Sequence, residues 1–408
     1  MNIWITLIIV IVTYVGIALG EFPNLKVNRT TITLIAVGAL LLTQQITFGQ
    51  IGQFLDLNTL VLLFGMMIVN ANLQLAGFFS LAGSAILRLT HTPRGLLALE
   101  IIIAGFFSAL FLNDNICLML TPLILDITLA SKRNPIPYLI ALATASNIGS
   151  AATLTGNPQN MIIAIASKIS YTQFALALTP IALLGMGSIW LVIIWLYPDE
   201  FRSGHLERSD FVEPRVYRPL LYKSLLVTAG LLIGFIIGTP VAESALIAAC
   251  VLLLTRRVHP DKVLSRVDWN LMIFFSALFI VSGTMEVSGL HAQLFAPLVA
   301  ALGGSPIKLA AVAVILSNLI SNVPAVLLLK PIIPQLPDPP AAWLTLAATS
   351  TLAGNLTLLG SVANLIVAEV ASRHNVKLTF WEYTRAGFII TIISILLGIV
   401  WLRLFIWK

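Results

Sequence analysis

Two short polar motifs interrupt apolar stretches of the first half of the chain, and both contain groups that bind ions. Asn-Asp-Asn occupies positions 113–115, and Gly-Asn-Pro-Gln-Asn occupies positions 156–160. Glycine permits unusual backbone angles and proline favours the first turn of a helix, so the second motif predicts a helix that breaks and restarts. Free amides at the restarted helix favour an anion, whereas carboxylate, amide and unwound carbonyl oxygens suit Na+ or a proton.

The same two motifs recur in the second half of the chain. Asn-Val-Pro at 322–324 repeats positions 113–115 with an offset of 209, and 357–364 repeats 153–160 with an offset of 204. Breaks at matching places in two halves are the best sequence indication of a transporter's binding site. The predicted substrate- and ion-binding residues are Asn113, Asp114, Asn115, Thr155, Gly156, Asn157, Asn160, Ser321, Asn322, Thr357, Gly360, Ser361 and Asn364. Within this set, the candidates for holding Na+ are Asn113, Asp114, Gly156, Asn157, Asn322 and Gly360.

Asp114 is the most informative single residue of these motifs. An ionisable group at bilayer depth is costly, so it indicates a function by default. Asp114 could bind a cation, carry a proton or do both; the structural alternative is a carboxyl satisfied by neighbouring amides. Its repeat partner is Val323, so the two halves are chemically unequal at this point. We therefore expect the coupling ion to depend mainly on the first half.

The composition places these motifs in a membrane protein. Of 408 residues, 58% are hydrophobic and 10% are charged, whereas a soluble domain carries about 25% charged residues. Apolar stretches recur at lengths close to the ~20 residues that span a bilayer. The predicted crossings are 3–20, 31–48, 58–76, 137–166, 175–197, 219–238, 241–255, 269–287, 342–370 and 385–406. Residues 95–130 and 306–333 are too long for one crossing and have polar centres, so each predicts a re-entrant hairpin.

The distribution of basic residues predicts the orientation. Most of the 23 Lys and Arg residues, including Lys26 and Arg29, fall in loops that this arrangement places on the cytoplasmic side. Both termini are then extracytoplasmic, and the two hairpins open from opposite sides. The prediction is an all-α integral membrane protein with about ten transmembrane helices, two re-entrant hairpins and midplane breaks in helices 137–166 and 342–370. Two inverted repeats, 1–198 and 219–408, are joined by a cytoplasmic linker at 199–218.

Five motifs of this chain resemble the ion transporter superfamily, which includes arsenite permeases, citrate and divalent-anion/sodium symporters and some sodium/proton antiporters. They are Phe-Leu-Asn-Asp-Asn at 111–115, Asn-Ile-Gly-Ser at 147–150, Gly-Asn-Pro-Gln-Asn at 156–160, Ser-Asn-Val-Pro at 321–324 and Gly-Ser-Val-Ala-Asn at 360–364. The chain looks closest to uncharacterised bacterial anion permeases. Divalent-anion symporters carry Ser-Asn-Thr at each hairpin tip, where it contacts sodium and substrate carboxylate. Val323 departs from that pattern, and Asn113-Asp114 resembles the arsenite permeases. The resemblance implies an elevator-type motion and often a homodimer.

These observations predict a secondary active transporter that moves a small anion across the bacterial inner membrane, coupled to Na+ or H+. The open alternatives are an arsenite/antimonite efflux permease, a Na+/H+ antiporter and, in another class, a passive channel. An enzyme is not expected, because the sequence has no nucleophile–base pair or metal cluster for such chemistry. The expected partners are the lipid bilayer and a small anionic substrate; no cofactor other than the coupling ion and no nucleic acid is expected.

Overall fold

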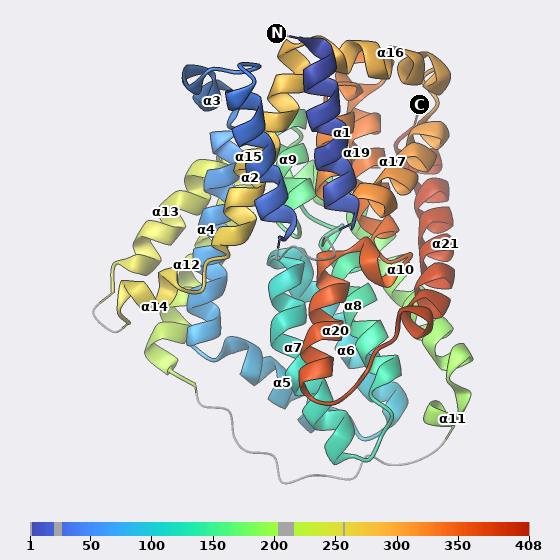
Figure 1. The fold of residues 1–408 in the computed structure, drawn as a ribbon. Helices are drawn as coiled ribbons and strands as arrows, with labels where there is room; N and C mark the ends of the chain where they lie inside the picture. Colours follow the sequence, from blue (N-terminus) through green and yellow to red (C-terminus); the bar gives the residue numbers. More distant parts are fainter. Residues whose placement is uncertain (1, 20–26, 203–215, 256–257, 408) are drawn as a thin grey trace.

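The computed structural model describes residues 2–19, 27–202, 216–255 and 258–407 (Figure 1). In these ranges the chain forms helices and connecting loops, with no β-strand. The all-α prediction is therefore confirmed. The predicted linker at 199–218 falls largely on positions 203–215, which lie outside the described residues.

The first half of the chain contains two hairpin helices and a broken helix behind a group of leading helices. The leading helices are α1 (Ile3–Leu19), α2 (Arg29–Leu42), α3 (Phe48–Phe54), α4 (Leu57–Leu75) and α5 (Phe78–Leu89). The others are α6 (Pro93–Leu110), α7 (Asn113–Ala130), α8 (Ile136–Ser150), α9 (Pro158–Ser167), α10 (Tyr171–Leu196) and α11 (Pro198–Phe201).

The second half repeats this order. Its leading helices are α12 (Arg218–Ile237), α13 (Val241–Leu253), α14 (Pro260–Leu264), α15 (Trp269–Val287) and α16 (Leu290–Leu302). They are followed by α17 (Pro306–Ile320), α18 (Asn322–Leu329), the 3-10 turn η1 (Ile333–Gln335), α19 (Pro339–Ala353), the 3-10 turn η2 (Leu358–Gly360), α20 (Val362–Arg373) and α21 (Phe380–Phe405).

The two predicted hairpins are present and point in opposite directions. Helices α6 and α7 occupy the lower part of Figure 1, whereas α17 lies in the upper part, and the marks for both chain termini lie near the upper end. Seven helices, α4, α6, α7, α10, α12, α15 and α21, are long and apolar enough to cross a membrane. This arrangement agrees with an integral membrane protein built around opposed hairpins.

Helix α2 is shorter than predicted. A crossing was predicted at 31–48, but α2 has 14 residues and ends at Leu42, before Gln44, which adopts a left-handed backbone conformation with φ 55°. At its other end, α2 begins at Arg29, where the Asn28 side chain accepts a hydrogen bond from the Thr31 amide at 2.9 Å. The start of α2 therefore includes a residue that the sequence prediction placed in a loop.

The broken helices form the centre of the molecule. Every residue of α8 is buried, and so are most residues of α19. Helix α8 packs against α6 and α7 of its own hairpin, and α19 packs in the same way against α17 and α18. The leading helices of each half pack against those of the other half: α4 packs on α13, and α2 packs on α15. The hairpins and broken helices thus share one buried core that neither half forms alone.

Candidate functional site

The break in the first half is held open by asparagine side chains. Asn157 caps α9 by accepting a hydrogen bond from the Asn160 amide at 2.9 Å. The Asn160 side chain donates to the carbonyl oxygens of Ser150, at 3.2 Å, and Thr153, at 2.9 Å. These carbonyls have lost their helical partners, and hydrocarbon would offer them no replacement. Asn160 therefore serves as structural support for the break.

The break in the second half uses the same contacts at positions displaced by 204. The Asn364 side chain donates to the carbonyl oxygens of Gly354, at 2.8 Å, and Thr357, at 3.1 Å. Ser361 caps α20, as the residue 204 positions earlier caps α9. The offset found in the sequence therefore describes equivalent hydrogen bonds in space.

Two glycines allow each unwound segment to lie against its own hairpin. A Cβ atom on Gly156 would overlap the carbonyl oxygens of Ser150 and Ser108, the second of which belongs to α6. A Cβ atom on Gly360 would lie 2.8 Å from the Gly354 carbonyl oxygen and 3.1 Å from Oδ1 of Asn318 in α17. The Gly156 carbonyl also accepts a hydrogen bond from the amide of Asn113, the first residue of α7, at 3.0 Å.

Asn147 of α8 joins the motifs of the two halves. Its Oδ1 accepts hydrogen bonds from Asn113 Nδ2, at 2.9 Å, and Ser361 Oγ, at 3.0 Å. Its Nδ2 donates to the Oδ1 atoms of Asn355, at 2.8 Å, and Asn364, at 2.9 Å. The sequence analysis gave Asn147 no binding role, whereas its hydrogen bonds connect motif residues of both halves. The sequence does carry one sign of this role: Asn147 is an amide side chain in the middle of a mainly apolar helix, where it needs hydrogen-bond partners.

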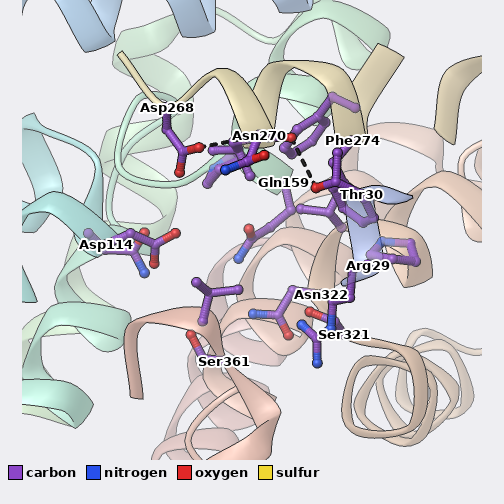
Figure 2. A pocket seen from close by; sticks show the side chains of 17 residues that line it. Arg29, Thr30, Asp114, Gln159, Asp268, Asn270, Phe274, Ser321, Asn322 and Ser361 are labelled. Atoms are coloured by element: carbon purple, nitrogen blue, oxygen red, sulfur yellow. Dashed lines mark hydrogen bonds between the residues drawn. The ribbon is translucent and has the colours of Figure 1, made fainter. Parts of the chain in front are cut away.

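A cavity of about 180 Å³ lies beside this network (Figure 2). Five of the predicted residues line it, namely Asn113, Asp114, Ser321, Asn322 and Ser361. Seven others do not line it and are buried or, for Thr357, half-buried: Thr155, Gly156, Asn157, Asn160, Thr357, Gly360 and Asn364. Asn115 is half-buried and does not line the cavity. Prediction from motifs therefore located the site but did not separate the residues that face it from those that support it.

Further lining residues come from elements that the motifs did not indicate. Helix α2 contributes Arg29 and Thr30, and the start of α15 contributes Asp268, Asn270 and Leu271. The remaining lining residues are Pro158, Gln159, Phe274, Phe275, Val323, Pro324 and Val362. Arg29, which the sequence analysis placed in a loop, is instead the first residue of α2, and its side chain points into the cavity (Figure 2). An arginine before an apolar stretch has the appearance of a loop residue in sequence.

Six helices begin at the cavity. The first residues of α2, α7, α9, α18 and α20 line it, and so does the first turn of α15. Side chains cap α2, α9, α15 and α20, whereas α7 and α18, which start at the hairpin tips, have no side-chain cap. Helix N-termini carry a partial positive charge and unpaired amides, so their convergence favours an anion.

Three side chains bring formal charge to the cavity wall. Asp268 accepts a hydrogen bond from the Leu271 amide at 2.9 Å, which caps α15. The side chains of Asp114 and Arg29 form no hydrogen bond or ion pair with any residue in the described ranges. Figure 2 shows them on opposite sides of the cavity, with Ser321 and Asn322 nearer to Arg29. The cavity is therefore polarised.

The two hairpin tips also present oxygen atoms without partners. Oδ1 of Asn113 and Oδ1 of Asn322 are buried and have no hydrogen-bond partner. These residues are repeat equivalents at the offset of 209. Because a buried acceptor without a partner costs free energy, these oxygens are suited to a bound cation or a hydrogen-bond donor of a ligand.

A second cavity, of about 510 Å³, lies between the start of α4, the later part of α15 and the end of α18. Asp56 and Lys330 line it and form an ion pair at 3.7 Å. Glu286, near the end of α15, also lines this cavity. The wall of this second cavity thus carries charged side chains, whereas the network around Asn147 consists of uncharged polar ones.

The opposed hairpins, paired breaks and central cavity define a polytopic membrane transporter. Residues 5–353 match CitMHS, the family described as "Citrate transporter", and the chain belongs to this family. The resemblance to the ion transporter superfamily is therefore confirmed, and so is the expectation that the protein is a transporter rather than an enzyme.

Curated relatives cover nearly the whole chain. The silicon efflux transporter LSI3 of Oryza sativa subsp. japonica is 31% identical over 92% of this chain and 93% of its own. The 46 kDa membrane protein of Mycobacterium leprae is 30% identical over 98% of each chain. The putative transporter arsB of Dictyostelium discoideum is 23% identical over 92% of this chain and 87% of its own.

The fold also matches a solved transporter. The YdaH transporter of Alcanivorax borkumensis, whose structure is described as having an unusual topology, superposes with a TM-score of 0.64. The match covers 99% of this chain and 97% of the other, at 18% sequence identity. This likeness shows a shared fold.

Proposed function

We propose that the protein is a secondary active transporter of a small anion, coupled to Na+ or H+. The observation that carries this proposal is the convergence of six helix N-termini and Arg29 on one cavity. In a site removed from bulk water, such groups attract negative charge more strongly than they do in solution. The proposed location is the bacterial inner membrane, with both termini outside.

The coupling cation belongs at the Asp114 side of the cavity in this proposal. Asp114 has no partner among the described residues, and the neighbouring Asn113 presents the unpaired Oδ1. A cation or proton there would neutralise the carboxylate and so favour entry of an anion. Binding of the cation and the anion would then be mutually favourable, which is the thermodynamic requirement for symport.

We propose that the hairpins and broken helices move together as one unit. Hydrogen bonds through Asn147 connect α8 with α7, with α20 and with Asn355, which follows the end of α19, so we expect these elements to move together. On the opposite wall, Thr30 Oγ1 donates to the Asn270 carbonyl at 3.2 Å and ties α2 to α15. Elevator-type sliding of the first group against the second, within a homodimer, would expose the cavity alternately to each side.

Efflux of a small uncharged hydroxylated solute is the second candidate. It is favoured by the relative named as a silicon efflux transporter and by the two carboxylates, Asp114 and Asp268, in the cavity wall. With both ionised, the three charged side chains sum to −1. A neutral solute would enter without compensation by a cation, whereas an anion would need it.

Uptake into proteoliposomes tests the proposal. Purified protein would be reconstituted and assayed with citrate, phosphate and arsenite under an imposed Na+ gradient, an imposed pH gradient or neither. The proposal expects an anion to accumulate against its own gradient with one of the two cation gradients. Accumulation of arsenite alone, insensitive to charged competitors, would favour the second candidate. Equilibration without accumulation would indicate a channel.

A further inference from the structure

The central cavity separates its charged groups. Asp114 stands at one side, beside the first hairpin tip, and Arg29 stands at the other, on the side of Ser321 and Asn322 (Figure 2). The second tip carries no charge, because Val323 occupies the place of Asp114. The two sides therefore present opposite electrostatic environments to a ligand.

Arg29 is held in place by its backbone rather than by a charged partner. Asn28 caps the helix directly before it, and Thr30, directly after it, bonds to the Asn270 carbonyl. The first contact orders the first turn of α2 and the second ties that turn to α15, so the guanidinium is directed into the cavity without an ion pair from a described residue. A half-buried cation of this kind is costly until an anion joins it.

The second hairpin tip supplies complementary groups. Ser321 has φ 76° and ψ 160°, a positive-φ conformation that is strained for a residue with a Cβ atom, and its side chain does not cap α18. The amides of Asn322 and Val323, the first two of α18, make none of the backbone hydrogen bonds outside the helices, and the third residue, Pro324, has no N–H. Planar guanidinium groups bind carboxylate and other oxyanions through paired hydrogen bonds, which helix amides can supplement.

We propose that Arg29 and the Ser321–Asn322 tip form the anion subsite, and that Arg29 determines specificity for anionic over neutral substrates. This inference rests on the proposed anion transport. It also divides the subsite between two groups of helices, because Arg29 lies on α2 whereas the tip belongs to the hairpin. The full anion contact then exists only where the hairpin stands beside α2, so the anion is held most tightly at one position of the transport cycle.

The test compares Arg29→Gln and Arg29→Lys with wild type in proteoliposomes, using citrate and phosphate as anionic probes and arsenite as the neutral one. Loss of a charged hydrogen-bonding partner should raise the KM for the transported anion about tenfold or more, while leaving the maximal rate within about threefold. Arg29→Lys should recover part of the affinity because it keeps the charge but not the paired geometry. Arg373→Gln is the matched control, since Arg373 is exposed and pairs with Glu369 away from the cavity.

The outcomes separate the two levels of the proposal. An anion transported by wild type with the same KM in Arg29→Gln would overturn the role of Arg29 and leave the proposed function standing. Wild type that transports neither anion would overturn the proposed function itself. If Arg29→Gln does not purify as a folded protein, the KM of Arg29→Lys decides, and a wild-type value there would also count against the subsite.

Discussion

The two halves of the molecule differ at their hairpin tips while agreeing at their helix breaks. At the breaks, Asn160 and Asn364 make equivalent hydrogen bonds to carbonyl oxygens displaced by 204 positions. At the tips, an aspartate of the first half stands where the second half has valine. At bilayer depth the unpaired carbonyl oxygens of each break need hydrogen-bond donors, and in both halves an asparagine side chain supplies them.

This difference shows which parts of a repeat the fold constrains. The contacts that hold an interrupted helix cannot be dropped from one half without leaving buried polar groups unpaired. The side chains that face the cavity have no such requirement, so each half can carry different chemistry. We therefore expect symmetric substitutions to have similar structural costs at the breaks and unequal functional costs at the tips.

The largest effect is expected at the first tip. Asp114→Asn removes the charge while keeping the shape, and it should lower cation-driven uptake about a hundredfold, because a charged site loses roughly 3 kcal/mol or more with its partner. Initial rates under the driving gradient measure this. The matched control is Asp199→Asn, at an exposed surface position. Coupled uptake that survives in Asp114→Asn would remove Asp114 from the mechanism.

The glycines of the two breaks should differ in their tolerance of a methyl group. Gly156→Ala places Cβ against two backbone carbonyls that cannot move aside, whereas the nearest atoms at Gly360 lie farther away. We expect losses of unfolding free energy of about 3 kcal/mol for Gly156→Ala and about 1 kcal/mol for Gly360→Ala. Thermal unfolding in detergent checks this, with Gly187→Ala as a control because its Cβ would meet no atom within 4 Å. Equal losses at Gly156 and Gly187 would contradict the close packing.

The supporting asparagines of both breaks should contribute to stability. Asn160→Ala and Asn364→Ala each remove two hydrogen bonds to buried carbonyls, so each should cost about 1–3 kcal/mol of unfolding free energy. The cost at Asn364 should be the higher, because its Oδ1 also accepts from Asn147. Melting temperatures of the two variants, compared in one detergent, measure the difference. An Asn160 variant with wild-type stability would break the equivalence of the two halves.

The smallest effect is expected at the second tip. Val323→Thr keeps the side-chain shape and replaces one methyl group with a hydroxyl, at a position that lines the cavity. We expect a change in KM of less than about threefold, because the hydroxyl adds no charge and can bond within the tip. A change as large as that of Asp114→Asn would mean that the tips are functionally equivalent after all.

Much of this architecture was predictable from the sequence. Apolar lengths, paired motifs and basic loops predicted both hairpins and both breaks, since each follows from the needs of a backbone in lipid. The offset of 204 also predicted that Asn160 and Asn364 occupy equivalent positions in the two halves. The end of α2 was not predictable, because the local turn at Gln44 sets it rather than apolar length.

The site was only partly predictable, for a physical reason. Motif residues identify where a helix breaks, but whether a side chain faces the cavity depends on packing between distant elements. Arg29 enters the site because α2 packs on α15. Asn147 connects the motifs of the two halves because α8 packs against both α7 and α20. Neither contact leaves a periodic pattern in the sequence.

The central claim is that the cation site lies at Asp114, apart from the anion subsite. The most direct test measures two quantities without an anion present: the binding of radioactive sodium, and the rise in melting temperature when the pH is lowered. Both are measured on purified wild type, Asp114→Asn and Arg29→Gln. We expect that the cation that binds wild type, Na+ or H+, no longer binds Asp114→Asn but still binds Arg29→Gln. Undiminished cation binding by Asp114→Asn would contradict it.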